Sequence, residues 1–323
     1  MANQLDQKKK ASLASRILVA AILLAVFIPC FVLGGYYWLG FVCLAFIIGV
    51  YEYVHCTQKG YSWWVYAIAY LLSGCTFLWF IFEGLATMDD FVLSAPLSGL
   101  SISPLWIGIS LLSYFGLGLF DKKVGVDGVF YLFGMGLLVS LGMQALICVR
   151  LFPMSLDLQN HAPDFLYFGS AAYFIFVAIA TIMNDTWAYF VGIFFGKHKM
   201  IPSVSPNKTW EGFFGGWILG GLTCFLFALL SDYFGYPILP GLVMFGEGNR
   251  FWAVLLLSFA LPLIGNLGDL SFSLIKRHFG TKDYGTILRA HGGVLDRVDS
   301  FCFTMIFAAI VASLSTGNYA AWF

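Results

Sequence analysis

Residues 165–196, FLYFGSAAYFIFVAIATIMNDTWAYFVGIFFG, determine how the rest of this chain is arranged. A helix needs about 20 predominantly apolar residues to cross the hydrocarbon core of a bilayer. The run is therefore too long for one simple crossing and too short for two full ones, and Asn184 and Asp185 lie inside it. Whether it crosses once or twice decides on which side of a membrane every later residue lies.

The composition of the whole chain excludes a water-soluble fold. Of its 323 residues 60% are apolar and only 11% are charged, whereas soluble domains have about 45–50% apolar and about 25% charged residues. The formal net charge is zero, which argues against a nucleic-acid partner. The seven cysteines are isolated, a pattern typical of small buried apolar side chains and not of a zinc or disulfide framework. We expect an all-α polytopic membrane protein.

Nine runs are long and apolar enough to be transmembrane helices. They cover roughly residues 16–35, 36–54, 63–83, 104–120, 128–149, 165–196, 212–231, 251–268 and 299–315. The first follows a basic stretch (Lys8, Lys9, Lys10 and Arg16) but is longer than a signal-peptide core and lacks an evident cleavage site. We expect it to be retained as a helix.

Charge asymmetry resolves the ambiguous run. If residues 165–196 cross once and the amino terminus is cytoplasmic, only Arg150 and Arg250 of the 17 Lys and Arg residues fall outside, as the positive-inside rule favours. We therefore predict about nine spans, with a helix about 48 Å long at 165–196 that tilts or projects into the cytoplasm. The chain divides into a basic tail (1–15), a five-span bundle (16–164) and a catalytic domain of four spans with cytoplasmic loops (165–323).

The densest polar cluster follows the eighth span. Asp269, Ser273, Lys276 and Arg277 have the spacing i, i+4, i+7 and i+8, which is one face of a helix continuing from that span. The cluster goes on through a loop into the ninth span, with Lys282, Asp283, His291, Gly292, Gly293, Asp296, Arg297 and Asp299. Where the loop folds back, we expect Asp269 and Asp296 to be close together at the cytoplasmic membrane face.

This residue combination is typical of a metal-assisted phosphate site. Carboxylates and hydroxyls suit Mg²⁺, Lys and Arg bind phosphate, and Gly292–Gly293 before a helix would let backbone N–H groups approach an anion. Alternatively, the charges only anchor the spans. That explains Lys and Arg but not acids at an apolar boundary, where ionisable groups are costly. His291 could serve in acid–base catalysis or only hydrogen-bond within its loop.

A second cluster runs from Asn184–Asp185 to residues 205–212, SPNKTWEG. Ser205–Pro206 breaks the chain, Asn207 or Thr209 could cap the next helix, and Glu211 favours its amino end. Lys208 at that end suggests a bound anion, although an ordinary polar turn explains it equally well. Further on, Gly215–Gly216 and Gly220–Gly221 would permit close helix packing, either in a homodimer or within one chain.

Residues 273–299, SLIKRHFGTKDYGTILRAHGGVLDRVD, resemble the signature of the phosphatidate cytidylyltransferase (CDP-diacylglycerol synthase) family. The similarity covers roughly residues 180–300 and includes Asn184–Asp185 and SPNKTWEG. Arg289 stands where the family usually has Pro or a small residue, and Asn207 replaces a commonly basic one. Neither departure touches the acidic residues.

The resemblance implies that CTP and phosphatidate react to give CDP-diacylglycerol and diphosphate, a step of phospholipid biosynthesis. It implies Mg²⁺, with K⁺ assisting, at Asp269 and Asp296, supported by Asp299, and catalytic cations at Lys276 and Arg277. The candidate substrate-binding residues are Lys208, Ser273, Lys282, His291, Gly292, Gly293 and Arg297. The expected partners are CTP, phosphatidate and membrane lipid. The simplest location is a bacterial inner membrane, with the endoplasmic reticulum as the alternative.

Two other functions compete with this one. A CTP-dependent polyisoprenol or phytol kinase would transfer the γ-phosphate to a lipid alcohol and release CDP. A secondary transporter would use Asp185, Asp269 and Asp296 as an ion relay, although transporter acids usually lie near the midplane within inverted repeats. A structural scaffold leaves the spacing of the 273–299 motif unexplained.

Overall fold

The computed structural model describes residues 19–81, 100, 102–157, 163–238, 244–245, 250–288 and 292–315, and most of them are helical. The first helix covers Val19–Leu33. The others are α2 (Gly35–Cys56), α3 (Trp63–Phe77), α5 (Pro104–Phe120), α6 (Gly125–Asp157), α7 (Pro163–Phe195), α8 (Trp210–Tyr233), α9 (Phe251–His278) and α10 (Leu295–Ser315). Strands β1 (Lys199–Ile201) and β2 (Ser205–Thr209) form an antiparallel hairpin between α7 and α8.

The apolar helices confirm an all-α polytopic membrane protein. Within the described ranges, six helices are long and apolar enough to cross a membrane: α2, the 125–151 part of α6, the 171–195 part of α7, α8, α9 and the 295–314 part of α10. Val19–Leu33, α3 and α5 are apolar but shorter. All nine coincide with the segments expected from the sequence. The number of crossings and the side on which the site lies stay predictions.

Helix α7 confirms that the ambiguous run forms a single helix. It is 33 residues long, and the polar pair at its centre does not break it. Asn184 is 1% exposed, and its side-chain oxygen accepts a hydrogen bond at 3.0 Å from Asn266 of α9. A buried amide is costly unless it is hydrogen-bonded, so the partner on α9 lets α7 continue through the bundle.

Glycines bring α7 and α8 close together. A Cβ atom at Gly216 would lie 2.6 Å from the carbonyl oxygen of Asn184, and one at Gly220 would lie 2.9 Å from the Asn184 Cα. Gly215 meets Val191 of α7, and Gly221 meets Phe259 of α9, in the same way. The glycine-rich stretch therefore packs within one chain, and a homodimer stays a prediction.

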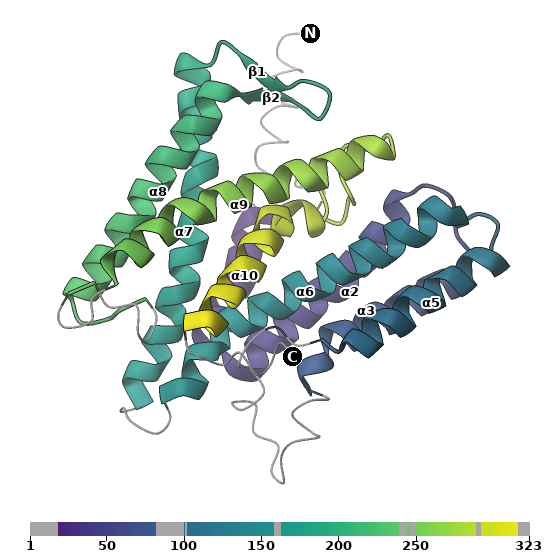
Figure 1. Cartoon of the computed structure of the whole chain (residues 1–323), viewed down its shortest axis with the longest axis horizontal. Helices are drawn as coiled ribbons and strands as arrows, with labels where there is room; N and C mark the ends of the chain where they lie inside the picture. The colour runs from purple at the N-terminus through teal and green to yellow at the C-terminus, as the bar shows by residue number, and fades with distance from the viewer. Residues whose placement is uncertain are drawn as a thin grey trace.

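Figure 1 shows two groups of helices with α10 between them. Helices α2, α3, α5 and α6 lie side by side in one group, and α7, α8 and α9 form the other, with the hairpin at one end of α7 and α8. Helix α10 packs against α9, α6 and α7, and its first turn also meets α2. The division into an amino-terminal bundle and a carboxyl-terminal catalytic domain stays a prediction.

The hairpin was not expected from the sequence, which indicated only a turn before α8. Its end does match the expected cap. The hydroxyl of Thr209 accepts a hydrogen bond at 3.1 Å from the backbone N–H of Gly212, at the start of α8. Glu211 accepts hydrogen bonds from the backbone N–H groups of Lys197 and His198. It thereby ties the start of the hairpin to the amino end of α8.

Candidate active site

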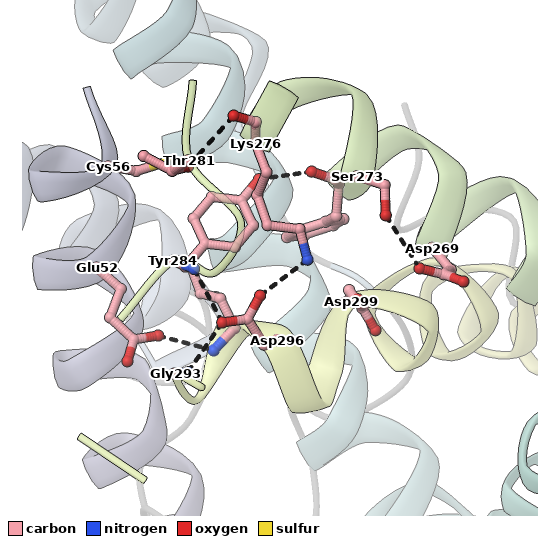
Figure 2. Close-up of polar contacts among 12 residues, drawn as sticks. Glu52, Cys56, Asp269, Ser273, Lys276, Thr281, Tyr284, Gly293, Asp296 and Asp299 are labelled. Carbon is pink, nitrogen blue, oxygen red and sulfur yellow. Dashed lines mark hydrogen bonds and ion pairs between the residues drawn. The ribbon is translucent and has the colours of Figure 1, made fainter. Parts of the chain in front are cut away.

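The loop between α9 and α10 is fastened to the carboxylate of Asp296. This carboxylate accepts hydrogen bonds from the backbone N–H groups of Tyr284 (2.9 Å) and Gly293 (2.8 Å) and forms an ion pair of 2.8 Å with Lys276 of α9. The side chains of Lys276 and Asp296 are only 9% and 4% exposed. Figure 2 shows the carboxylate at the centre of these contacts. Three donors thus surround a nearly buried carboxylate.

The amino end of α10 does bind an anion, as the glycine pair suggested, but the anion belongs to the protein. The backbone N–H groups of Val294 and Leu295 donate to the carboxylate of Glu52, which reaches over from α2. Gly292 has a φ of +78°, in the left-handed region, and a Cβ atom there would lie 2.8 Å from an Asp296 oxygen. Contact between Gly292 or Gly293 and a substrate phosphate stays a prediction.

Glu52 is not among the site residues predicted from the sequence, because it lies in an apolar run far from the motifs. A signal was present: Glu52 is an acid within an apolar run, and such residues are costly and usually have a partner or a function. That partner is 242 residues away in the sequence.

A pocket of about 480 Å³ lies between α7, β2, α8 and α9. Its charged residues are Asp185, Lys208 and Asp269, and Asn266 also lines it. The rest of the lining is Ala188, Tyr189, Gly192, Ile193, Asn207, Thr209, Gly212 and Phe213. The pocket thus has a charged side beside a largely apolar wall of α7 and α8, which suits a ligand with both an anionic and an apolar part.

Lys208 and Asp269 form the charged pair of this pocket. Their side chains are 2.6 Å apart, and each is 27% exposed. Ser273, one turn along α9, donates to Asp269 at 3.3 Å. The structure therefore brings Lys208, Ser273 and Asp269 together, three of the residues that the motifs singled out.

Two further residues place a second carboxylate in the pocket. Asn266 donates to Asn184, and the Asn184 amide in turn donates to Asp185 at 3.2 Å. Asp185 belongs to the second polar cluster predicted from the sequence, whereas Asn266 was not predicted. Only its position three residues before Asp269, on the same helix face, could have indicated it.

Asp299 lies between the two parts of the site. It is three residues after Asp296 on α10, and its carboxylate accepts the backbone N–H of Ser300 at 2.7 Å. Asp269, Asp296 and Lys276 are all within electrostatic range of it, and Figure 2 shows Asp299 between Asp296 and Asp269. The acids of α9 and α10 therefore line one region of the protein.

The other predicted residues fall into three groups. Arg277 donates to the carbonyl oxygens of Val204 and Thr281, so it joins the turn of the hairpin to the end of α9. Lys282 and Arg297 are exposed. His291 lies outside the described residues.

Tyr284 is a fixed donor in the loop. Burial raises the pKa of its phenol, so the hydroxyl stays protonated and donates to the carbonyl oxygen of Phe272.

The carboxylates differ in how readily they could bind a metal ion. Their hard oxygen atoms suit Mg²⁺, and Asp269 is partly exposed beside Asp185 and Asn266 in the pocket. Asp296 already holds three donors, so it could bind a metal only after Lys276 moved away. Within the residues that the structure describes, no three His, Cys, Asp or Glu side chains form a ready metal-binding group.

Fold and site together define a class of protein: a multi-pass membrane protein whose acids and cations gather where α7, α8, α9 and α10 meet. The chain belongs to the cytidylyltransferase family, whose model matches residues 14–315. This confirms the resemblance inferred from the motifs.

Three curated relatives show the level of similarity. Proteins named phosphatidate cytidylyltransferase from Staphylococcus epidermidis and Staphylococcus aureus are 41% and 42% identical, each match covering 41% of this chain and 46% of the relative. One from Staphylococcus haemolyticus is 42% identical over 44% of this chain and 51% of the relative. The chain thus spans about half the length of the curated relatives it matches.

Proposed function

We propose that this protein transfers the cytidylyl group of CTP to phosphatidate, releasing diphosphate and forming CDP-diacylglycerol. The observation that carries the proposal is the pocket in which the Lys208–Asp269 pair faces an apolar wall of α7 and α8. A phosphatidate molecule has this dual character. The names of the relatives and the match of the family model support the same substrate pair.

In the proposed reaction a phosphate oxygen of phosphatidate attacks the α-phosphorus of CTP in line. A new P–O bond forms, and the bond between the α-phosphorus and the bridging oxygen breaks, so diphosphate leaves with that electron pair. The attacking phosphate is already an anion and needs no strong general base. Bringing two anions together is the main obstacle, and positioned cations lower it.

Lys208 and Lys276 are the cations best placed for this work. Each is paired with a carboxylate, at 2.6 Å and 2.8 Å, which keeps a site in low-dielectric surroundings close to neutral. We propose that both lysines turn from these carboxylates to substrate phosphates on binding. Arg277 supports Lys276 from the same end of α9 by holding the hairpin turn through Val204.

We further propose that Asp269 and Asp299, joined by Asp296 once Lys276 has turned away, hold Mg²⁺, with K⁺ as a second ion. When bound, the metal would neutralise charge on the triphosphate. Asp185 faces the same pocket as Asp269, and Ser273 orients Asp269 by its hydrogen bond.

We propose a bacterial inner membrane as the location, with the site at the cytoplasmic face, where CTP is available. The bacterial relatives support this location. It also fits the gathering of basic residues at one end of the helices.

The test is direct. Detergent-purified protein is incubated with Mg²⁺, phosphatidate and CTP labelled in the cytidine, and lipid-bound cytidine and free diphosphate are measured. The proposal expects both products in equal amounts and their loss on chelation. A phosphorylated lipid alcohol with CDP would instead indicate the kinase. Solute uptake into proteoliposomes without any nucleotide chemistry would indicate the transporter.

A variant pair checks the site. Asp269→Asn should lower turnover at least about a hundredfold, the size of effect typical when one electrostatic contact to a transition state is lost. Asp127→Asn makes the same change at an exposed position in the first turn of α6 and should leave turnover unchanged. Equal activity of the two variants would refute the assignment of Asp269.

A further inference from the structure

Glu52 is a buried acid that the proposed chemistry does not use. It lies near the end of α2, is 1% exposed, and accepts hydrogen bonds from Val294 N–H at 2.9 Å and Leu295 N–H at 2.8 Å. Burial of a carboxylate is costly unless its charge is compensated. Here two backbone donors and the positive end of the α10 dipole provide the compensation.

Two glycines of the loop are fitted to this carboxylate. A Cβ atom at Gly285 or at Gly293 would lie 2.5 Å from Glu52 Oε1. Gly293 does not have the positive φ that favours glycine, so the backbone alone would accept alanine there. The nearby Glu52 carboxylate therefore explains why residue 293 is a glycine. This explanation does not require Gly293 to contact a substrate.

The same stretch of backbone positions Asp296. The N–H of Gly293 donates to Asp296, while the next two N–H groups donate to Glu52. Figure 2 shows the two carboxylates on either side of this short segment. Moving the segment therefore moves the donor that orients Asp296 and, through Asp296, the ammonium group of Lys276.

The end of α2 also contacts the start of the loop. Cys56, one turn after Glu52, lies 3.4 Å from the hydroxyl of Thr281. Tyr131 of α6 donates to the Tyr53 carbonyl oxygen at 2.8 Å and packs edge-on against Phe279, with ring centroids 4.5 Å apart. The amino-terminal bundle thus contacts the α9–α10 loop at both of its ends.

We propose that Glu52 is a positioning residue for the cytidylyl transfer: from the amino-terminal bundle it fixes the start of α10 and so holds Asp296 in place, both while Lys276 is paired with it and after Lys276 has turned to substrate. This inference rests on the proposed function. It gives residues of the first five spans a role in the chemistry although none of them needs to touch a substrate.

The first test is Glu52→Gln, which keeps the shape of the side chain. An amide has one acceptor oxygen, so one of the two N–H groups loses its acceptor and faces an NH₂ group instead. Loss of a residue that orients catalytic groups typically costs about 10–100-fold, and kcat should fall by that amount. KM for CTP and for phosphatidate should stay within about threefold, because Glu52 lies outside the pocket.

The second test does not depend on activity. Hydrogen exchange at the amides of Val294 and Leu295 should become faster in Glu52→Gln, whereas exchange in α8 should be unchanged. The matched control is Trp38→Phe, which removes a buried hydrogen bond of 3.0 Å to Leu146 in the same bundle. It should lower the unfolding temperature while leaving kcat and loop exchange as in the wild type.

A double-mutant cycle separates this role from substrate binding by the glycine. Gly293→Ala should reduce kcat at least about tenfold in the wild type but less than about twofold in a Glu52→Ala background, because the clashing carboxylate is gone. If Gly293 binds substrate instead, the penalty should be the same in both backgrounds. The unfolding temperature, measured over the same cycle, should show the same non-additivity.

The inference fails if Glu52→Gln keeps wild-type kcat and wild-type exchange at Val294 and Leu295. It also fails if Trp38→Phe lowers kcat as much, because the effect would then be general destabilisation. Wild-type protein that transfers no cytidylyl group would refute the proposed function. Exchange and unfolding would in that case still decide whether Glu52 holds the loop.

Discussion

Replacing Asp296 by Asn should lower the free energy of unfolding of the protein and also abolish its activity. The change removes the charge that pairs with Lys276 at 2.8 Å, and these side chains are only 4% and 9% exposed. Removing one member of a buried ion pair costs about 3–5 kcal/mol, because the other charge remains buried without compensation. The backbone donors of Tyr284 and Gly293 already share one carboxylate oxygen, Oδ2, so an amide oxygen can keep both only if its NH₂ group faces the Lys276 ammonium group.

The same substitution at Asp269 gives the contrast. Its pair with Lys208 is 27% exposed at both side chains, so water screens it more than the Asp296 pair, although the Lys208 Nζ atom itself is buried. Asp269→Asn should therefore lose activity with a smaller loss of stability than Asp296→Asn.

The assay is reversible unfolding of the purified protein in mixed micelles. Tryptophan fluorescence is measured as the concentration of the denaturing detergent is increased. The double variant Lys276→Met/Asp296→Asn should recover at least about 1 kcal/mol relative to Asp296→Asn, since no charge is then left buried. A free energy of unfolding of Asp296→Asn within about 1 kcal/mol of wild type would refute the view that this pair is sealed from solvent.

Three other outcomes are expected. Thr209→Ala should lower the free energy of unfolding by about 1 kcal/mol, because the hydroxyl that caps Gly212 N–H is lost; thermal unfolding measures this, and an unchanged midpoint would contradict it. Gly216→Ala should cost about 1–3 kcal/mol, because its Cβ would lie 2.6 Å from the Asn184 carbonyl oxygen. Gly74→Ala, which meets nothing within 4 Å, is its control and should not destabilise the protein; equal losses would argue against close α7–α8 packing. Chelation of divalent ions should abolish turnover and Mg²⁺ should restore it, and full activity in excess chelator would exclude the metal proposal.

Much of the fold could be predicted because the length of apolar runs and the distribution of Lys and Arg can be read from the sequence without any knowledge of long-range contacts. The single helix α7 followed from counting Lys and Arg on each side of residues 165–196. The extension of α9 to His278 followed from the spacing of Asp269, Ser273 and Lys276. The α9 inference used only neighbouring residues, whereas the α7 inference used the distribution of charge along the whole chain.

The site could be predicted only in part, because its contacts join distant segments. The motifs named Lys208, Asp269, Lys276 and Asp296, yet nothing local indicated that each lysine would pair with one particular aspartate. A phosphate at the start of α10 stays a prediction, whereas the anion that the structure shows there is the carboxylate of Glu52, 242 residues away in the sequence. Sequence spacing carries no information about such a partner.

The two lysine–aspartate pairs also have a consequence for selectivity between ligands. A divalent cation that binds alone would displace a lysine ammonium group and leave it without a counter-charge. A polyphosphate that binds alone would leave a carboxylate without its lysine. Each unpaired charge raises the free energy of the complex in surroundings of low polarity. When a cation and a polyphosphate bind as one complex, the carboxylates can bind the cation and the lysines can bind the phosphates. No charge is then left without a partner. The two pairs would therefore favour a chelate of a cation and a polyphosphate over either ion alone.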